Sequence, residues 1–343
     1  MAERAPRAVI FGVAGPIPSE AERSFFADAD PLGFILFARN CSAPEQVRTL
    51  VDDLRTCVGR ADAPVLIDQE GGRVRRLNPP SWRAPPAAEV FGHLCARDER
   101  RAVEAAWLNA RLIAADLAEL GITVNCTPVL DVRHPGAHAI IGDRAFADEA
   151  ETVALLGRAT CAGLLAGGVL PVIKHIPGHG RATRDSHQAL PVVEAALADL
   201  RRVDFASFAA LADMPMAMTA HVVYADVDPN APATTSTAVL AEVVRGMIGF
   251  DGLLISDDLC MRALTGSPGE RAAAALAAGC DVVLHCSGDL DEMREVAGAS
   301  PPLSAGAVDR LARARAMLRP VQPFDRAGAE RRLADLLGAT AIA

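Results

Sequence analysis

The 343-residue chain is poor in aromatic residues, in basic charge and in long apolar runs. Aromatic residues make up only 4% of it, so the core must be built from the Ala, Val, Leu and Ile that dominate its 51% hydrophobic content. The net charge of −9 leaves no basic field to attract nucleic acid or an anionic membrane. No apolar run approaches the ~18 residues of a membrane span, and the short run from Ala8 to Gly15 suits a first strand better than a secretory signal. We therefore expect neither a nucleic acid nor a membrane as partner.

Paired cysteine motifs are also missing. The eight cysteines are scattered and form no CxxC pair, and Cys126, Cys161 and Cys280 lie inside apolar runs. This pattern is typical of reduced, buried thiols and not of a disulfide framework or a zinc knuckle. It predicts a cytoplasmic protein.

Strand-like and helix-like segments alternate along almost the whole chain. Apolar runs predict strands at 8–15, 33–37, 64–67, 122–130, 169–173, 216–220, 252–256 and 281–285. Helical spacing predicts helices at 44–58, 98–120, 149–166, 197–211, 236–248, 269–278, 289–297, 305–318 and about 327–337. Buried strands that alternate with helices indicate an α/β fold with a parallel sheet.

No linker or shift in composition marks a second domain. We predict one domain over residues 1–343, a TIM-type (β/α)8 barrel of seven or eight strands, one of which can be irregular. Residues from about 326 to 343 are expected to form a C-terminal helical extension. A doubly wound sheet is disfavoured because the segment from Gly12 to Gly15 lacks the GxGxxG fingerprint of dinucleotide sites. No cofactor is expected.

The most informative stretch runs from Val169 to His187. It begins as a buried strand that we expect to end at Ile173, followed by a loop rich in glycine. Charged and titratable residues crowd this loop: Lys174, His175, His179, Arg181, Arg184, Asp185 and His187. Barrels build their active sites from residues at the C-terminal ends of strands. The stretch therefore predicts a functional site, although His175 and His179 make an improbable metal pair because Pro177 and Gly178 prevent a helix between them.

Three more strand ends carry polar residues, and in a barrel all would converge on one face. They are DQEGGRVRR at 68–76, IGDRAF at 141–146 and ISDDLCM at 255–261. Each residue has a plainer interpretation. Asp68 could be a helix N-cap, Arg76 and Arg144 could form surface ion pairs, and Lys174 could be a Schiff-base lysine.

The ordered motifs DQEGGRV, KHIPGHG with the following DSH, and SDDLCM resemble those of glycoside hydrolase family 3, and most of all its single-domain bacterial β-N-acetylglucosaminidases. The resemblance runs from about Val9 to Ser287. Two positions depart from the common pattern, since Ile176 stands where Phe is common and Cys260 where Ser is common. Neither position is expected to touch the reacting bond.

The resemblance implies a role for each matching residue. Asp257 resembles the family's catalytic nucleophile, and His187, with Asp185 as its partner, resembles the general acid/base. The residues expected to hold the terminal sugar are Asp68, Arg76, Arg144, Lys174 and His175. The roles of Asp258 and His179 stay open, and His221 is left as a wall residue without a role.

The resemblance implies a cofactor-free, retaining exo-β-N-acetylglucosaminidase, acting as a monomer on a small oligosaccharide or muropeptide in peptidoglycan recycling. An imidazole near its usual pKa of ~6.5 can donate and then accept a proton near neutrality. The alternatives are a β-glucosidase or β-xylosidase of the same family, a non-catalytic sugar-binding barrel, and a Schiff-base lyase that uses Lys174.

Overall fold

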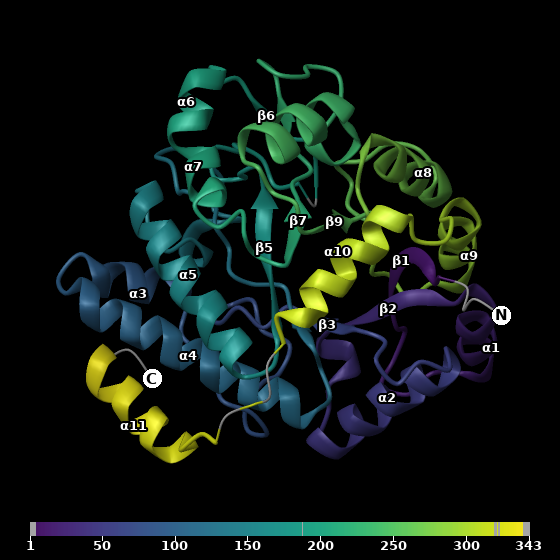
Figure 1. Ribbon diagram of the computed structural model, residues 1–343, viewed down its shortest axis with the longest axis horizontal. Coiled ribbons are helices and arrows are strands. Elements are labelled where there is room, and N and C mark those ends of the chain that lie inside the picture. Colours follow the sequence, from purple (N-terminus) through teal and green to yellow (C-terminus); the bar gives the residue numbers. More distant parts are fainter. Residues whose placement is uncertain (1–4, 187, 319–320, 322, 339–343) are drawn as a thin grey trace.

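The computed structural model describes residues 5–186, 188–318, 321 and 323–338. Eight parallel strands close into a barrel in the order β1-β10-β9-β7-β5-β4-β3-β2 (Figure 1). Their bounds are β1 Arg7–Gly12, β2 Pro31–Leu36, β3 Val65–Ile67, β4 Val124–Asn125, β5 Leu170–Ile176, β7 Met216–Thr219, β9 Leu253–Asp258 and β10 Val282–His285. The prediction of a TIM-type (β/α)8 barrel is confirmed.

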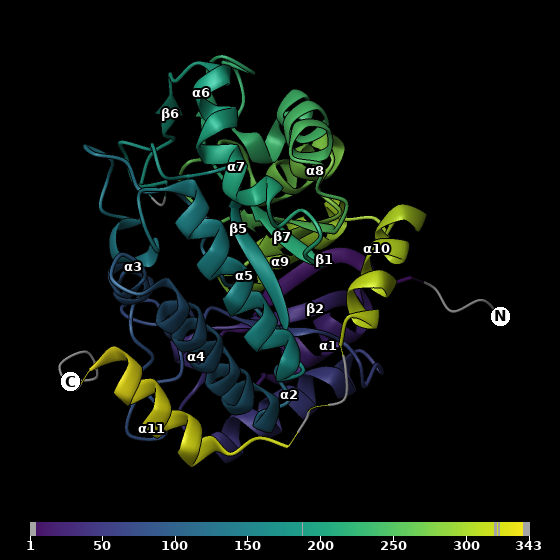
Figure 2. The same cartoon turned by 60° about the vertical axis from the view of Figure 1, so that its left-hand side comes forward.

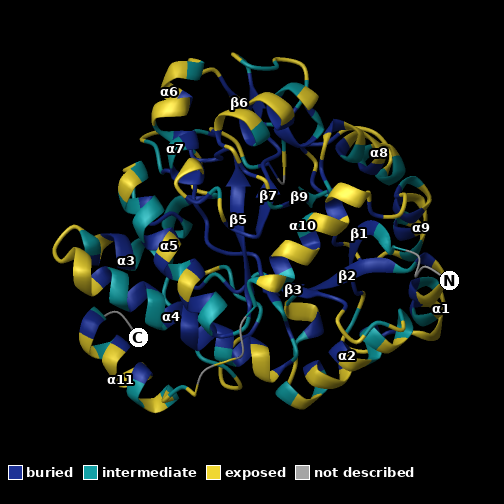
Figure 3. Cartoon of the chain, viewed as in Figure 1, coloured by how far each residue is buried: buried dark blue, intermediate teal, exposed yellow. Residues whose placement is uncertain are grey.

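Alternation along the strands divides the core into two layers. Side chains such as Ile10 and Ile35 pack inside the barrel, whereas their neighbours Phe11 and Phe34 pack between the barrel and the helices. Because successive side chains of a strand point to opposite faces, a strand that is buried on both faces is apolar throughout. Figure 3 shows these strands as buried and the exposed residues on the outer faces of the helices.

Helices surround the barrel, and one more helix closes the end at which the strands begin. Those that follow the strands are α1 Glu20–Ala29, α2 Pro44–Cys57, α3 Ala88–Cys95, α4 Glu99–Glu119, α5 Ala150–Ala166, α6 Leu197–Arg202, α7 Asp204–Ala209, α8 Pro268–Ala278 and α9 Leu290–Ala299. Helix α10 Ala305–Ala316 lies across the barrel in Figure 1. Its buried side chains, among them Leu311, join the inner layer of the core. Helix α10 thus covers the N-terminal end of the strands and leaves their C-terminal ends for a site.

The last helix, α11 Arg326–Leu337, packs against α4 on the outside of the barrel (Figure 2). Leu333 and Leu336 are buried in this contact. Two ion pairs border it, Arg332 with Glu104 at 2.7 Å and Arg326 with Asp116.

Several strand predictions differ from the structure at their ends, and those for β5 and β4 are the two that bear on the site. Strand β5 does not end at Ile173 but continues through Lys174 and His175 to Ile176. Backbone pairing sustains it, since Lys174 N–H donates to the Pro128 carbonyl at 3.1 Å and Leu130 N–H donates to the Lys174 carbonyl at 2.7 Å. The strand predicted over 122–130 is reduced to β4, because Pro128 has no N–H for a ladder.

Several helices also differ from prediction. The segment 197–211 is divided into α6 and α7 at Val203, and the segment 236–248 forms a π-helix over Val239–Met247. Helices α1 and α3 were missed, as was the small parallel pair of β6 Val192–Val193 and β8 Val223–Tyr224. Helix α1 carried a readable signal, because Ser19 and Glu22 form a capping box at its start.

Two further expectations can be compared with the structure. All eight cysteines are unpaired, and Cys126, Cys161 and Cys280 are buried as predicted. Within the described residues, no helix combines the length and the apolar character needed to cross a membrane.

Packing around Gly92 provides a test of the helix-to-barrel contacts. A Cβ on Gly92 of α3 would lie 1.7 Å from the Phe146 carbonyl oxygen, whereas a Cβ on Gly298 of α9 would meet nothing within 4 Å. We predict that Gly92→Ala lowers the free energy of unfolding by about 1–3 kcal/mol through overpacking. The matched Gly298→Ala should leave it unchanged or raise it by up to about 1 kcal/mol. Urea unfolding of both variants checks this, and equal effects would contradict the described packing.

Candidate active site

A cavity of about 260 Å³ opens at the C-terminal ends of the barrel strands. Six residues predicted for the site line it together: Asp68, Arg76, Arg144, Lys174, His175 and Asp257. They come from the segment after β3, the 3₁₀ turn Gly142–Arg144, β5 and β9. The barrel therefore brings together groups that lie far apart in the sequence.

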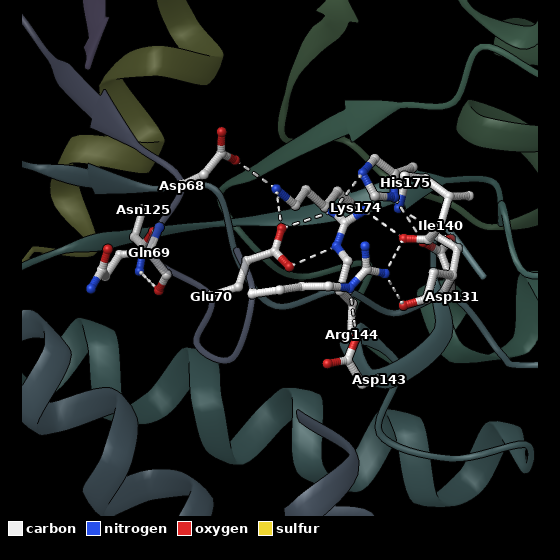
Figure 4. Close-up of polar contacts among 12 residues, drawn as sticks. Asp68, Gln69, Glu70, Asn125, Asp131, Ile140, Asp143, Arg144, Lys174 and His175 are labelled. Carbon is white, nitrogen blue, oxygen red and sulfur yellow. Dashed lines mark hydrogen bonds and ion pairs between the residues drawn. The ribbon is translucent and has the colours of Figure 1, made fainter. Parts of the chain in front are cut away.

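Lys174 is the buried centre of the site. Its Nζ lies 2.7 Å from Asp68 Oδ1 and 2.7 Å from Glu70 Oε1, and its side chain is only 3% exposed (Figure 4). Burial alone would lower the pKa of Lys174, but the two carboxylates outweigh burial and raise it above its usual value. Lys174 is thus an ammonium ion, not the neutral amine that Schiff-base formation requires.

Glu70 joins Lys174 to Arg144. Arg144 Nε lies 2.9 Å from Glu70 Oε2 and its Nη2 lies 2.8 Å from Oε1, which makes a bidentate ion pair (Figure 4). Burial works to raise the pKa of Glu70, yet Arg144 and Lys174 together hold it at about 2. Glu70 was missing from the predicted set, although it stands inside the DQEGGRV motif.

Asp131 organises the two histidines that follow Lys174. Its Oδ2 lies 2.7 Å from His175 Nδ1, and its Oδ1 accepts the backbone N–H of His179 at 2.6 Å (Figure 4 draws the His175 pair). Asp131 is fully buried, and His175 holds its pKa below the usual value against the opposing effect of burial. A carboxylate on Nδ1 requires the proton there, so His175 presents Nε2 to the cavity, 3.5 Å from Arg144 Nη2.

His179 also lines the cavity and is buried. Burial lowers its pKa to about 4, so it is neutral near neutral pH. Its Nε2 lies 3.1 Å from Ser186 Oγ, which connects the two ends of the loop that follows β5.

Arg76 reaches the cavity from the same segment as Asp68. Its Nη2 lies 3.1 Å from Asp68 Oδ2 and its guanidinium lies over the Phe37 ring at 5.2 Å. Gln69 fixes this segment, since its Oε1 accepts the backbone N–H groups of Arg76 and Leu77 at 2.8 and 3.1 Å.

Asp257 lies at the end of β9 with its carboxylate in the cavity wall. Oδ1 accepts the backbone N–H of Asp258 at 2.8 Å. Burial favours the neutral acid, but the imidazoles of His221 and His175 outweigh it and keep the pKa of Asp257 below its usual value. Asp257 is therefore a carboxylate, as a nucleophile must be.

Asp258 and His221, whose roles the sequence left unassigned, lie next to each other beside the cavity. Asp258 also borders the cavity, and its Oδ1 accepts the backbone N–H groups of Cys260 and Cys286 at 3.0 and 3.1 Å. His221 is not a wall residue, because it is fully buried behind the cavity. Its Nδ1 contacts Thr234 Oγ1 at 2.7 Å and its Nε2 contacts the Asp258 carbonyl oxygen at 3.0 Å.

The predicted acid/base pair is described only in part. His187 lies outside the residues that the structure describes. Asp185 does not line the cavity, and its Oδ2 accepts a hydrogen bond from Gln188 Nε2 at 3.0 Å. Ser186, between them, does line the cavity, so this segment borders the site.

The plainer interpretations of Asp68 and the two arginines do not fit these contacts. Asp68 caps no helix, since the next helix in the described chain, α3, begins at Ala88. The Arg144 side chain is 10% exposed, and Arg76 pairs with a cavity carboxylate, so neither forms an ordinary surface ion pair.

Glu70 should make stability depend on pH. Its pKa is 4.5 in an ordinary environment and about 2 in the folded protein, so the unfolded state binds more protons between these values. The stabilisation is complete above about pH 4.5 and is lost as the pH falls toward 2. We predict that Glu70→Gln lowers the free energy of unfolding at pH 7 and flattens its decline below pH 4.5, measured by urea unfolding.

Asp143→Asn is a matched control for that experiment, because it removes a carboxylate from an ion pair with Arg73 in which the side chains are 37% and 42% exposed. It should change stability by less than about 1 kcal/mol. A Glu70→Gln profile that runs parallel to the wild-type profile would show that Glu70 is not the titrating group.

Comparison with known proteins places this site in a family. Residues 11–313 match the glycosyl hydrolase family 3 N-terminal domain. A β-hexosaminidase from Bordetella avium is 39% identical over 316 residues, which cover 90% of this chain and 88% of that protein. A β-hexosaminidase from Chromobacterium violaceum is 38% identical over 309 residues, covering 89% and 85%.

Solved structures agree with the sequence relatives. NagZ from Neisseria gonorrhoeae, in complex with N-trifluoroacetyl-D-glucosamine, superposes with a TM-score of 0.88 at 33% identity and covers 98% of this chain and 100% of that one. A family 3 β-N-acetylglucosaminidase from Paenibacillus superposes with a TM-score of 0.84 at 30% identity, covering 96% and 66%. With the match over most of its length and a barrel that carries the expected cavity, the chain belongs to glycoside hydrolase family 3.

Proposed function

We propose that the protein is a retaining exo-β-N-acetylglucosaminidase that releases terminal β-1,4-linked N-acetylglucosamine. The amino sugar is supported by relatives named β-hexosaminidase and by the Neisseria NagZ structure that holds N-trifluoroacetyl-D-glucosamine. The observation that carries the proposal is the cavity itself, in which an ionised Asp257 shares one space with a fixed set of charged hydrogen-bonding groups.

The cavity suits a single sugar residue. At about 260 Å³ it is slightly smaller than the ~300–1,000 Å³ pockets that hold drug-sized ligands. Asp68 accepts hydrogen bonds, Arg76, Arg144 and Lys174 donate them, and His175 presents Nε2, so the hydroxyl groups of one pyranose find partners of both kinds. The mutual ion pairs hold these groups in place before substrate arrives, which favours recognition of a chain end and hence exo action.

The reaction we propose has two displacements. Asp257 attacks the anomeric carbon while the acid protonates the leaving oxygen, and the same group then takes a proton from the water that releases the sugar. We assign the acid/base role to His187, with Asp185 as its partner, from the DSH motif. The position of Ser186 in the cavity wall supports this assignment.

The similarity to the family 3 β-hexosaminidases also supports a proposal for the substrate in the cell. We assign the enzyme to cell-wall recycling in the cytoplasm, with a muropeptide or small oligosaccharide as substrate and the whole chain acting as one monomeric catalytic unit without a cofactor. The eight unpaired cysteines support a reducing compartment.

Hydrolysis of aryl glycosides tests the proposal. We expect release from aryl β-N-acetylglucosaminide but not from aryl β-glucoside, and a fall in kcat of ~10⁴-fold or more in Asp257→Asn, because the nucleophile is lost. Asp258→Asn is the matched control, since an amide oxygen can still accept the two backbone N–H groups, and it should lose far less activity.

The glucosidase and sugar-binding alternatives each have their own outcome in this assay. Preference for the glucoside would place the enzyme in the glucosidase branch of the family. Binding of N-acetylglucosamine without turnover by the folded wild type would make it a sugar-binding barrel and contradict the proposed function.

A further inference from the structure

A second cluster of reactive side chains lies immediately beyond Asp257, at the ends of β9 and β10. It consists of Asp258, Cys260 and His285, each of which offers one ligand atom within 4.8 Å of the other two. Cys260 Sγ lies 3.3 Å from His285 Nδ1. The proposed hydrolysis uses neither Cys260 nor His285.

The surroundings hold the side chains of Asp258 and His285 in place. Backbone N–H groups of Cys260 and Cys286 fix Asp258 Oδ1 at 3.0 and 3.1 Å. His285 is 1% exposed, and its Nε2 lies 3.0 Å from Ser287 Oγ and 3.3 Å from Glu292 Oε2.

The contact with Glu292 decides the tautomer of His285. A carboxylate can only accept, so Nε2 carries the proton and Nδ1 is the unprotonated nitrogen. Cys260 Sγ lies 3.3 Å from Nδ1 and 3.9 Å from Nε2, which places it beside the ring face, so the imidazole must rotate to direct its Nδ1 lone pair at a shared cation. A histidine that donates one ring N–H to a carboxylate and directs the other nitrogen at a cation is the arrangement that metal-binding histidines share. Without metal, burial, with Asp258, raises the pKa of the Cys260 thiol to about 12.

The dimensions and the donor types agree with a zinc site. Bond lengths of ~2.3 Å to sulfur and ~2.0–2.1 Å to nitrogen place the two ligand atoms about 3.6 Å apart in a tetrahedral site. The observed separation of 3.3 Å is close to this value, so the rotation of the His285 ring is the main adjustment that a bound cation requires. A thiolate, an imidazole and one carboxylate favour zinc or cobalt over magnesium or calcium, which prefer oxygen ligands.

We propose that Asp258, Cys260 and His285 bind a soft divalent cation such as Zn²⁺, which replaces the Cys260 thiol proton, and that this binding inhibits the enzyme. The proton leaves to solvent as the sulfur–metal bond forms. Inhibition follows because Asp258 is coupled to the nucleophile. Its backbone N–H donates to Asp257 Oδ1 at 2.8 Å and its carbonyl oxygen contacts His221 Nε2 at 3.0 Å. The binding stands apart from the proposed function, and only the inhibition rests on it.

Metal titration of the metal-free protein tests the binding. Co²⁺ should produce a thiolate-to-cobalt charge-transfer band that saturates at one equivalent, and Zn²⁺ should abolish it. Cys260→Ser should remove the band, and Glu292→Gln should weaken Zn²⁺ binding by ~10–100-fold through the loss of the carboxylate on His285. Cys57→Ser, at a half-buried thiol elsewhere, is the matched control and should titrate like wild type. A band that persists in Cys260→Ser would overturn the site.

The inhibition is tested on the same proteins with the aryl amino-sugar substrate. Zn²⁺ should inhibit the wild type reversibly, with activity restored by a chelator. Cys260→Ser should keep basal activity and require at least about tenfold more Zn²⁺ for the same inhibition. Equal sensitivity of the two proteins would overturn the inhibitory role. If the wild type proved inactive on every glycoside, the proposed function would fail while the cobalt titration still decided the binding.

Discussion

The charge on Lys174 is the constraint around which the site is arranged. An ammonium group that is 3% exposed is costly to bury, and it is offset here by carboxylates of Asp68 and Glu70 at 2.7 Å each. Glu70 also pairs with Arg144, and Asp68 also pairs with Arg76, so both carboxylates are shared between two cations. Removing one member of such a network leaves an uncompensated buried charge, at a cost of about 3–5 kcal/mol. Apolar residues could fill the same space, so we infer that the network serves a polar ligand and not the stability of the barrel.

Much of the fold could be predicted from the sequence because barrel strands are buried on both faces and therefore read as continuous apolar runs. The same rule explains the error at β5. Lys174 and His175 read as the start of a loop, since their partners Asp68, Glu70 and Asp131 come from distant segments that only the closed barrel brings close. The prediction over 122–130 was too long, whereas the prediction for β5 was too short. An apolar run does not indicate whether each backbone N–H has a carbonyl partner in the sheet.

The site was predictable to the extent that its residues stand in motifs. Six predicted residues meet in one cavity, but Glu70 and Asp131 were not predicted. Each supports its neighbours through ion pairs and hydrogen bonds that local sequence does not encode. The relevant signal for Glu70 was the second acid of DQEGGRV, and for Asp131 it was an acid at the end of a predicted strand. His221 was placed too close to the cavity, because a residue at a strand end can point either inward or behind the wall.

The proposed mechanism depends most on Asp257 as a covalent nucleophile and His187 as the acid/base. Its most direct test is rapid-quench mass spectrometry of His187→Ala with an aryl β-N-acetylglucosaminide whose leaving group needs no protonation. Without its base the second displacement is slow, so we predict that the protein accumulates one N-acetylhexosamine residue and that peptide mapping places it on Asp257. An adduct on another residue, or rapid turnover by His187→Ala with no adduct and inversion at the anomeric carbon, would contradict it.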